Sequence, residues 1–515
     1  MADEPQVSRS ELREATLEGV RWISVTRIVF EIVAMAGAVV LAHLVPPADY
    51  GRFAIALVVS EIALSLVNEG LGTPLVQRQT LTRRHIEGTA AVGLAGGLIL
   101  TVLTLYAAPL ITTPLFGEQT TELFRLYSPV FTFAGLMIVP LAILQRRLEF
   151  GRIGISEVAA AAAGTLTSVG LALAGLDAEA YVFGSLAGTA TWLLVLAVFA
   201  GAPAPRWRGP EIREVASVGV PAAGAGLAGI GSRNADYAIL GTQLSPALVG
   251  FYYRAFTIGV EYERKISGIV TRMALPVYSR TEDVDHMRSV RRRIVRLNAS
   301  SIFPLLAFFI VVAPVLVPWL FGDRWEPAVV PAQILAIAGM ATMLKNTIDP
   351  LVLAAGRPKA LMAFNVCELA LYAVMLVLVS SGGSLVAVCA GVAAFRVASL
   401  LASYVFLLGR TLDISLGELV GDAGPALGAC VALVAAALPA FMLLDAAVVP
   451  TLLACAAAGF AAYAATLRLI SPTAWADAMF VLGRIMPGGN ADGPINSGVG
   501  EFSVGMPGPV QPIAE

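Results

Sequence analysis

The sequence is short of charged residues, histidine and cysteine. Of its 515 residues, 14% are charged and three are histidine, whereas 57% are hydrophobic. Soluble globular domains carry about 25% charged residues, and the mean hydropathy here is +0.79. The composition argues against a soluble protein and predicts an all-α polytopic membrane protein.

The rare residue types also argue against several kinds of chemistry. The three histidines lie at span ends or in a loop without metal-ligand spacing. The cysteines have no paired spacing that would suggest a disulfide framework or a zinc site; they are Cys367, Cys389, Cys430 and Cys455. No connection between the predicted helices exceeds about 20 residues, which is too short for a soluble catalytic domain. We therefore expect no catalytic residue, no metal and no cofactor.

Fourteen apolar segments are long enough to cross a bilayer as helices. A crossing of about 30 Å needs roughly 20 mostly apolar residues. The predicted spans are 19–43, 50–74, 86–110, 121–144, 153–176, 181–200, 215–241, 247–278, 297–321, 329–354, 360–380, 384–408, 425–445 and 448–470. The eighth span is longer than one crossing needs, so we expect it to tilt or to extend beyond the membrane.

The basic residues fall on one side of this topology. Eighteen arginines and lysines lie in even-numbered connections between spans, and two, Arg52 and Arg324, lie in odd-numbered ones. Connections rich in such residues stay in the cytoplasm. The prediction is a plasma-membrane protein with both termini cytoplasmic, in which residues 1–18 form an interfacial segment with a short helix at 8–19.

Three short phrases recur in the same order along the chain. The pairs are PADYGRF at 47–53 with PALVGFY at 246–252, TPLVQR at 73–78 with LPVYSR at 275–280, and APLITTPLFGE at 108–118 with APVLVPWLFGD at 313–323. The offsets of 199, 202 and 205 residues indicate a duplicated unit of about 200 residues. Because each unit holds an even number of helices, both copies enter the membrane from the same side and the repeat is parallel.

The repeat predicts two six-helix lobes, residues 19–210 and 211–410, around a central cleft. Rocking, alternating-access transporters are built in this way and bind their cargo near mid-membrane. Residues 411–470 form two further helices outside the repeat, and the Gly- and Pro-rich tail at 471–515 is expected to be largely disordered and cytoplasmic.

Ionisable residues within the spans mark the candidate site. A charged side chain in hydrocarbon is costly, so those that persist usually face a wet cavity or each other. Away from span ends, spans 1–6 carry one basic and four acidic residues, whereas spans 7–12 carry seven basic and five acidic ones. The functional interpretation is a cavity whose second lobe offers cations to an anionic substrate.

This interpretation selects particular residues. The candidates for substrate binding are Arg233, Asp236, Arg254, Glu261 and Lys265, and the candidates for ion coupling are Glu31 and Glu61 in the first lobe. A structural interpretation stays open beside it. In that interpretation, pairs four residues apart, such as Arg27 with Glu31 and Lys345 with Asp349, neutralise each other and staple helices.

Two motifs are interpreted by their context. GAGLAG at 224–229 fits GxGxxG, but it lies inside an apolar span with no preceding strand, so we reject dinucleotide binding. The RRRIVR run at 291–296 is interpreted as a cytoplasmic topology anchor, with anionic lipid headgroups as the alternative partner.

Several longer segments resemble a known family. They are PADYGRF, LGTPLVQR at 71–78, LEFGRIGISEV at 148–158, SRNADYAILG at 232–241, ALVGFYYRA at 247–255, LFGDRWEPAV at 320–329 and AAGRPKAL at 354–361. With fourteen spans arranged as two lobes plus two helices, the chain resembles the Wzx-like polysaccharide flippases of the multidrug/oligosaccharidyl-lipid/polysaccharide exporter superfamily. The similarity covers about residues 15–470 and points to the branch that serves colanic acid and teichuronic acid export.

The resemblance implies a flippase for a polyprenyl-diphosphate-linked or similarly lipid-linked oligosaccharide. Such a protein moves its substrate from the cytoplasmic to the outer leaflet without ATP hydrolysis, with a proton or sodium gradient as the candidate energy source. By family position, Arg233, Asp236 and Arg254 match cavity-facing segments. The implied partners are the glycolipid and membrane lipids, with a polysaccharide polymerase and glycosyltransferases as candidates; we expect a monomer that binds no nucleic acid.

Three alternatives are weighed against this function. A cation-coupled multidrug exporter of the same superfamily is expected to have an acidic, aromatic-lined pocket, which the basic second lobe argues against. An intramembrane glycan polymerase or ligase would need a large outer loop that this sequence lacks. A non-transporting membrane component of glycan assembly predicts that charge reversal at Arg254 or Lys265 leaves function intact.

Overall fold

The structure is a computed structural model in which every regular element is a helix. It describes residues 9–57, 61, 72, 75–76, 81–201, 204–215, 234–261, 278, 284–443 and 447–485. Within these ranges, eleven helices or runs of consecutive helices are long and apolar enough to cross a membrane. The protein is therefore an all-helical, multi-pass membrane protein.

These eleven segments coincide with eleven of the fourteen predicted spans. The first runs from Val25 to Leu44 and the last from Val448 to Ile470. The other three predictions, 50–74, 215–241 and 247–278, fall partly on residues outside the described ranges, so they stay predictions. The predicted interfacial helix is helical but continuous with the first span, because α1 (Arg9–Leu44) runs through both without a break.

Contacts between residues divide the chain after Gly250 into two compact units, which we describe separately. Unit 1 precedes this point and unit 2 follows it, and α10 (Pro246–Phe256) crosses the division. The predicted lobe boundary at residues 210 and 211 stays a prediction, because residues 216–233 are not among those described.

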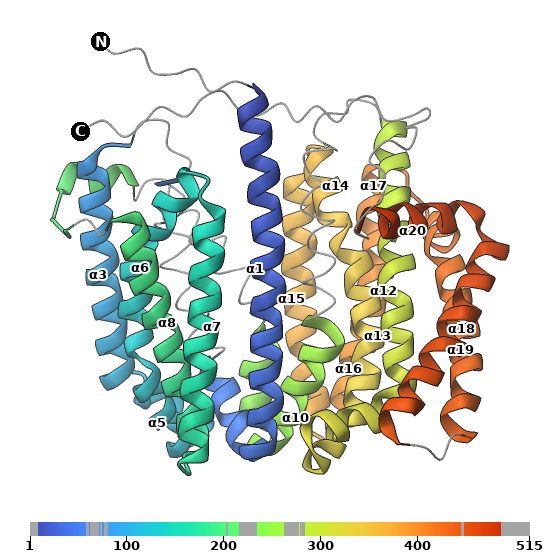
Figure 1. Ribbon diagram of the computed structural model, residues 1–515, viewed down its shortest axis with the longest axis horizontal. Helices are drawn as coiled ribbons and strands as arrows, with labels where there is room; N and C mark the ends of the chain where they lie inside the picture. Colours follow the sequence, from blue (N-terminus) through green and yellow to red (C-terminus); the bar gives the residue numbers. More distant parts are fainter. Residues whose placement is uncertain are drawn as a thin grey trace. The chain divides into compact units, whose positions relative to one another are not determined.

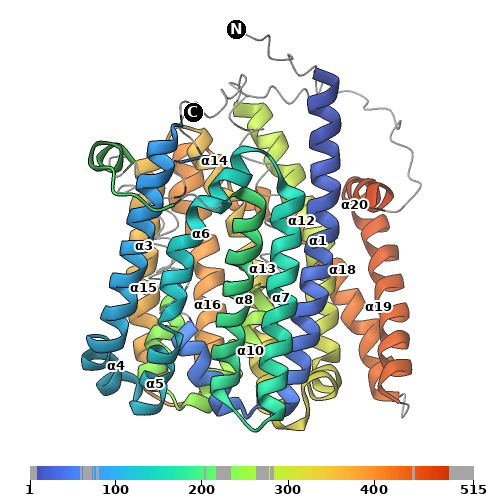
Figure 2. The same ribbon diagram turned by 60° about the vertical axis from the view of Figure 1, so that its left-hand side comes forward.

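Unit 1 is a bundle of long helices joined by short turns (Figure 2). Its helices are α1, α3 (Arg83–Tyr106), α4 (Pro109–Phe116), α5 (Glu118–Tyr127), α6 (Pro129–Arg146), α7 (Phe150–Leu173) and α8 (Ala178–Ala200). Helix α7 packs against α1 and α8, and α6 packs against α3 and α8. At one crossing, a Cβ on Gly93 of α3 would lie 2.3 Å from the Gly135 carbonyl oxygen of α6, so small residues allow this approach.

Unit 2 contains the longest helix and most of the described core. Its elements are η1 (Thr257–Glu261), α12 (Val284–Phe321), η2 (Asp323–Ala328), α13 (Val329–Asn346), α14 (Ile348–Ala354), α15 (Pro358–Ser380), α16 (Leu385–Ala402), η3 (Ser403–Leu408), α17 (Gly409–Thr411), α18 (Leu416–Leu443), α19 (Val448–Ile470) and α20 (Pro472–Ile485). Helices α18 and α19 form a hairpin, and α20 runs across it and contacts α12 and α19 (Figure 1).

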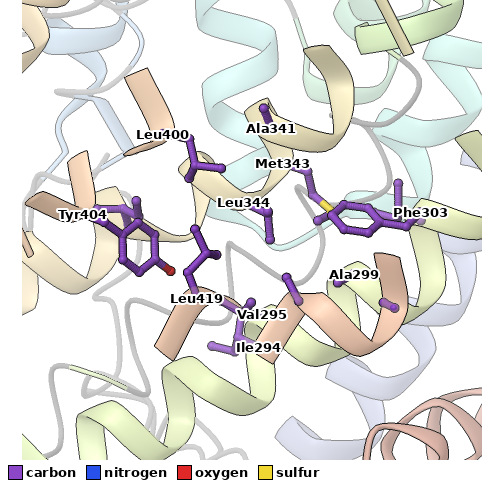
Figure 3. Packing of buried hydrophobic residues seen from close by; sticks show 14 of the residues in the cluster. Ile294, Val295, Ala299, Phe303, Ala341, Met343, Leu344, Leu400, Tyr404 and Leu419 are labelled. Atoms are coloured by element: carbon purple, nitrogen blue, oxygen red, sulfur yellow. The ribbon is translucent and has the colours of Figure 1, made fainter. Parts of the chain in front are cut away.

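The core of unit 2 joins nine of these elements, from α12 to α20. Figure 3 shows Val295 and Phe303 of α12 facing Met343 and Leu344 of α13, with side chains of α16, η3 and α18 around them. Val295 and Met343 are fully buried. Helix α18 is therefore packed into unit 2 although it lies outside the predicted repeat.

The two LFG phrases adopt the same local conformation. Gly117 and Gly322 have positive φ angles of 81° and 94°, which side-chain-bearing residues adopt only with strain. The Gly117 amide donates to the Thr113 carbonyl oxygen at 2.9 Å, and the Gly322 amide donates to the Pro318 carbonyl oxygen at 2.8 Å. In both copies the glycine ends one helix and the acidic residue after it begins the next.

Candidate functional site

The structure describes five of the seven residues predicted to bind the substrate or the coupling ion. These are Glu31, Glu61, Asp236, Arg254 and Glu261, whereas Arg233 and Lys265 lie outside the described residues. Unit 1 and unit 2 each contain charged groups within their spans.

In unit 1, the predicted pair on the first span is present. An Nη of Arg27 lies 2.8 Å from a carboxylate oxygen of Glu31, and the Arg27 side chain is 48% exposed. The Arg27 guanidinium also lies 5.0 Å from the ring centre of Phe30, and Glu157 on α7 interacts with it electrostatically. One cation thus stands beside two acids, of which the sequence pattern had paired only one with it.

This ion pair lies on an open face of α1. The residues of this face follow a helical spacing and are Arg27, Ile28, Glu31, Ile32, Met35 and Ala36. Charge at one end and apolar side chains beyond it make this face suited to a ligand with an anionic head and a hydrocarbon chain.

In unit 2, Arg254 is buried under two aromatic rings. Only 3% of the residue is exposed. Its guanidinium carbon lies 4.5 Å from the ring centre of Phe321 and 5.0 Å from that of Trp325, which are cation–π distances. Both rings belong to LFGDRW at 320–325, which contains the second of the two LFG phrases. Arg254 therefore connects α10 to the turn that follows α12.

The other predicted acids have different environments. Asp236 is fully buried, and one of its carboxylate oxygens accepts a hydrogen bond from the Tyr237 amide at 3.0 Å. Glu261 is half-buried at the end of η1, a π-helical turn. Glu61 is exposed and interacts electrostatically with the buried Tyr127.

A second charged group in unit 2 was not predicted as a unit. The Lys345 ammonium donates to a Glu368 carboxylate oxygen at 2.6 Å, and the Ser399 hydroxyl donates to the other oxygen at 2.7 Å. These residues come from α13, α15 and α16. Asp349 interacts electrostatically with both charges from α14.

Lys345 therefore forms its direct ion pair with Glu368, whereas Asp349, the partner predicted from the spacing of four residues, interacts with Lys345 only electrostatically. The boundary between α13 and α14 lies at Thr347, between Lys345 and Asp349. No basic residue stands three or four positions from Glu368 in its own helix. The packing of α15 against α14 and α16 brings Glu368 close to Lys345 and Ser399.

The RRRIVR run is engaged by acids of its own unit. Arg291 is 1% exposed, and it donates to Asp422 at 2.8 Å, to Glu418 at 3.1 Å and to the Tyr404 hydroxyl at 2.9 Å. Arg296 donates to Asp477 of α20 at 3.1 Å. These arginines therefore fasten α18 and α20 to α12, which argues against anionic headgroups as their main partner.

The fold is that of a membrane transporter. The chain matches the lipid II flippase MurJ in its inward closed conformation with a TM-score of 0.69, over 87% of this chain and 98% of MurJ, at 11% identity. It also matches an inward-facing multidrug resistance transporter of the MATE family in the MOP superfamily, with a TM-score of 0.57 over 76% of this chain and 97% of the transporter, at 14% identity. Identities this low show the fold alone.

The sequence identifies the family. The model of the polysaccharide biosynthesis protein family matches residues 40–330, more than half of the chain, and the chain belongs to that family. WzxC, a lipopolysaccharide biosynthesis protein of Escherichia coli K12, is 22% identical over 413 residues, which are 78% of this chain and 83% of WzxC. TuaB, a teichuronic acid biosynthesis protein of Bacillus subtilis 168, is 25% identical over 406 residues, which are 77% of this chain and 82% of TuaB.

Fold and family agree with the resemblance seen in the sequence. The protein is a multi-pass membrane protein of polysaccharide biosynthesis with the fold of a membrane transporter.

Proposed function

We propose that this protein moves a polyprenyl-diphosphate-linked oligosaccharide from the cytoplasmic to the outer leaflet of the cell membrane by alternating access. Family membership supports a role in polysaccharide biosynthesis. A glycan built on a lipid carrier at the inner face must cross the bilayer before it can be used outside. The substrate is then an amphiphile with a large sugar head, a phosphate group and a hydrocarbon tail.

The single observation that carries this proposal is the face of α1 on which a charged pair adjoins apolar side chains. Arg27 is half-exposed there within a candidate span, beside Glu31, and the apolar side chains of Ile28, Ile32 and Met35 continue from it. A guanidinium binds phosphate oxygens through charge-assisted hydrogen bonds. The hydrocarbon chain can lie along the apolar face while the phosphate group contacts Arg27.

The proposal includes two parallel six-helix lobes with cytoplasmic termini. The shared conformation of Gly117 and Gly322 supports a duplication, because both copies of the phrase turn in the same way. The excess of basic residues in even-numbered connections supports the orientation.

The further residues proposed to bind the phosphate-bearing head are Arg233, Asp236, Arg254, Glu261 and Lys265. Burial of Arg254 under Phe321 and Trp325 means that such a contact requires the aromatic cover to move. We propose Glu31 and Glu61 for coupling to a proton or sodium gradient. The ion pair of Arg27 with Glu31 supports Glu31 in this role, because a bound phosphate would compete with that carboxylate for the Arg27 guanidinium.

The test is a leaflet-access assay on purified protein in liposomes. A labelled polyprenyl-diphosphate oligosaccharide and a cationic dye are compared, with and without an imposed proton or sodium gradient. Protein-dependent movement of the glycolipid alone supports the flippase. Movement of the dye alone assigns the protein to multidrug export, and movement of neither supports a non-transporting role in glycan assembly.

The same assay tests whether Arg27 on this face of α1 contributes to glycolipid movement. Arg27→Ala should slow glycolipid movement at least tenfold, because one charge-assisted contact to phosphate is worth about 1.5–3 kcal/mol. Arg125→Ala is the matched control: Arg125 is 45% exposed and pairs with Glu122 three residues away. Equal rates for the two variants would remove Arg27 from the site.

A further inference from the structure

Glu87, the fifth residue of α3, interacts with three arginines. Its side chain is 5% exposed. Arg208 donates to one carboxylate oxygen from Nη2 at 2.9 Å and from Nε at 3.2 Å. Arg83 donates to the other oxygen at 3.2 Å, and an Nη of Arg206 lies 3.9 Å from it. We call these four residues the Glu87 latch.

The latch fastens a separate segment of unit 1 to α3. The connector, residues 204–215, follows α8 and ends in a helical stretch at 209–215. The Arg206 amide donates to the Glu87 carbonyl oxygen at 3.1 Å. A Cβ on Gly88 would lie 3.2 Å from the Arg208 Cβ and 3.3 Å from Ile212 Cγ1, so glycine there lets the connector lie close against α3.

Two further contacts extend the attachment. His85 Nε2 lies 3.2 Å from a carboxylate oxygen of Glu214. Arg84 lies 4.0 Å from Glu211. The connector is therefore held along most of its described length, from Arg206 to Glu214.

Unit 2 carries a corresponding attachment at the matching place in the sequence. Arg291 follows Glu87 by 204 residues and Glu418 follows Glu214 by 204 residues, within the range of the repeat offsets. Arg291 donates to Glu418 at 3.1 Å and so fastens the start of α18 to α12. Both units thus tie the third helix of the predicted lobe to the segment that follows its sixth helix.

The contacts favour a latch that stays closed. Opening breaks charge-assisted hydrogen bonds to Glu87, which are stronger than neutral ones. Opening the connector would strip Glu87 of Arg206 and Arg208 together and leave it only Arg83 from its own helix. A connector that is closed in this way moves with unit 1 as one body.

We propose that Glu87 is a positioning residue, which holds the connector on α3 throughout the transport cycle, and that transport requires this closed connector. Only the claim that transport requires the closed connector rests on the proposed function. The claim that Glu87 holds the connector on α3 concerns the molecule without its substrate and can be measured separately.

The first experiment measures opening of the connector. Trypsin cleaves after arginine, and the connector offers Arg206, Arg208 and Arg213. In detergent-solubilised protein, Glu87→Gln should be cleaved in the connector about tenfold faster than wild type, since cleavage follows the population of the open form. Glu211→Gln is the control and should be cleaved at the wild-type rate, because its pair with Arg84 is long, at 4.0 Å, and the Arg84 side chain is 71% exposed. Equal cleavage of Glu87→Gln and wild type would overturn the proposal.

The second experiment replaces the latch by a covalent bond. Gly88→Cys with Arg208→Cys brings two Cβ atoms to about 3.2 Å, close to the disulfide range of roughly 3.5–4.5 Å. The variant is made with Cys367→Ser, because Cys367 is the exposed native cysteine among the described residues. We expect glycolipid movement near the wild-type rate when the protein is oxidised, and at least a tenfold loss when the same sample is reduced.

Every result of this experiment decides the proposal. Loss of transport in the oxidised protein would show that the connector has to open, and full transport in the reduced protein would show that the latch is dispensable. A redox effect that reverses in one sample also separates positioning from misfolding. If wild type moves no glycolipid, the proposed function fails, and the trypsin rates decide whether Glu87 holds the connector.

Discussion

The attachments in unit 1 and unit 2 occupy matching places but have opposite charge. In unit 1 an acid on α3 is surrounded by arginines, two of them from the connector. In unit 2 an arginine on α12 is surrounded by Glu418 and Asp422 of α18 and by Tyr404 of η3. The location of the attachment is shared, whereas the direction of charge is not.

The inversion means that the partners of Glu87 and Arg291 are not interchangeable. Arg206 and Arg208 would repel Arg291, and Glu418 and Asp422 would repel Glu87. Juxtaposed like charges are unfavourable by several kcal/mol at an interface. Each of these two charges therefore requires its own set of partners.

The two attachments also differ in burial. Arg291 is 1% exposed and its partner Asp422 is 9% exposed, whereas the arginines of the Glu87 latch are between 34% and 76% exposed. Charge pairs that water reaches are weaker and more easily opened than buried ones. We therefore expect removal of Arg291 to affect the whole of unit 2, and removal of Glu87 to act locally.

The largest effect is expected for Arg291→Met. This change leaves the buried Asp422 without its closest cation and should destabilise unit 2 by about 3–5 kcal/mol. Thermal unfolding in detergent would measure it as a lower Tm. Arg292→Met is the control, because Arg292 pairs with Glu418 from an exposed position. Equal Tm values for the two variants would contradict the difference in burial.

A smaller effect is expected at the turns that both copies share. Alanine at Gly322 would adopt a backbone region open essentially to glycine, at a cost of about 1–3 kcal/mol, and Gly117→Ala should lose a similar amount. Gly170→Ala, on α7 with open space around its Cβ position, should cause no loss. Unequal losses at Gly117 and Gly322 would show that the two copies have diverged in their turns.

The smallest change in global stability is expected for Glu87→Gln. Its partners are solvated once released, so Tm should fall by roughly 2 °C or less while the connector becomes accessible to trypsin. Differential scanning calorimetry of wild type and Glu87→Gln measures this change in Tm, which is then compared with the change caused by Arg291→Met. A Tm loss as large as that of Arg291→Met would mean that the latch is part of the core of unit 1.

Spans and turns were predictable because local rules decide them. Hydropathy located all eleven spans that the structure describes, and the repeated LFG phrases marked turns that share a glycine conformation. The pair of Arg27 with Glu31 was predictable for the same reason, since one helix turn separates them.

Pairings between helices were not predictable from these rules. Lys345 pairs directly with Glu368, 23 residues away, because the packing of neighbouring helices brings the two side chains together. Arg254 lies in the ALVGFYYRA segment at 247–255, and packing places it under Phe321 and Trp325. The RRRIVR run was recognised as basic, but its acidic partners on α18 and α20 follow it by more than 100 residues.

The sequence by itself determined that the chain crosses the membrane many times, which segments cross it, and which family it belongs to. These follow from hydropathy and from motifs, because lipid requires long apolar helices whatever their neighbours are. Only the tertiary structure decided which charges meet. Glu87 finds Arg208 at a distance of 121 residues and Arg291 finds Asp422 at 131, because a charge in a packed helix bundle is neutralised by whatever side chain the packing brings within reach.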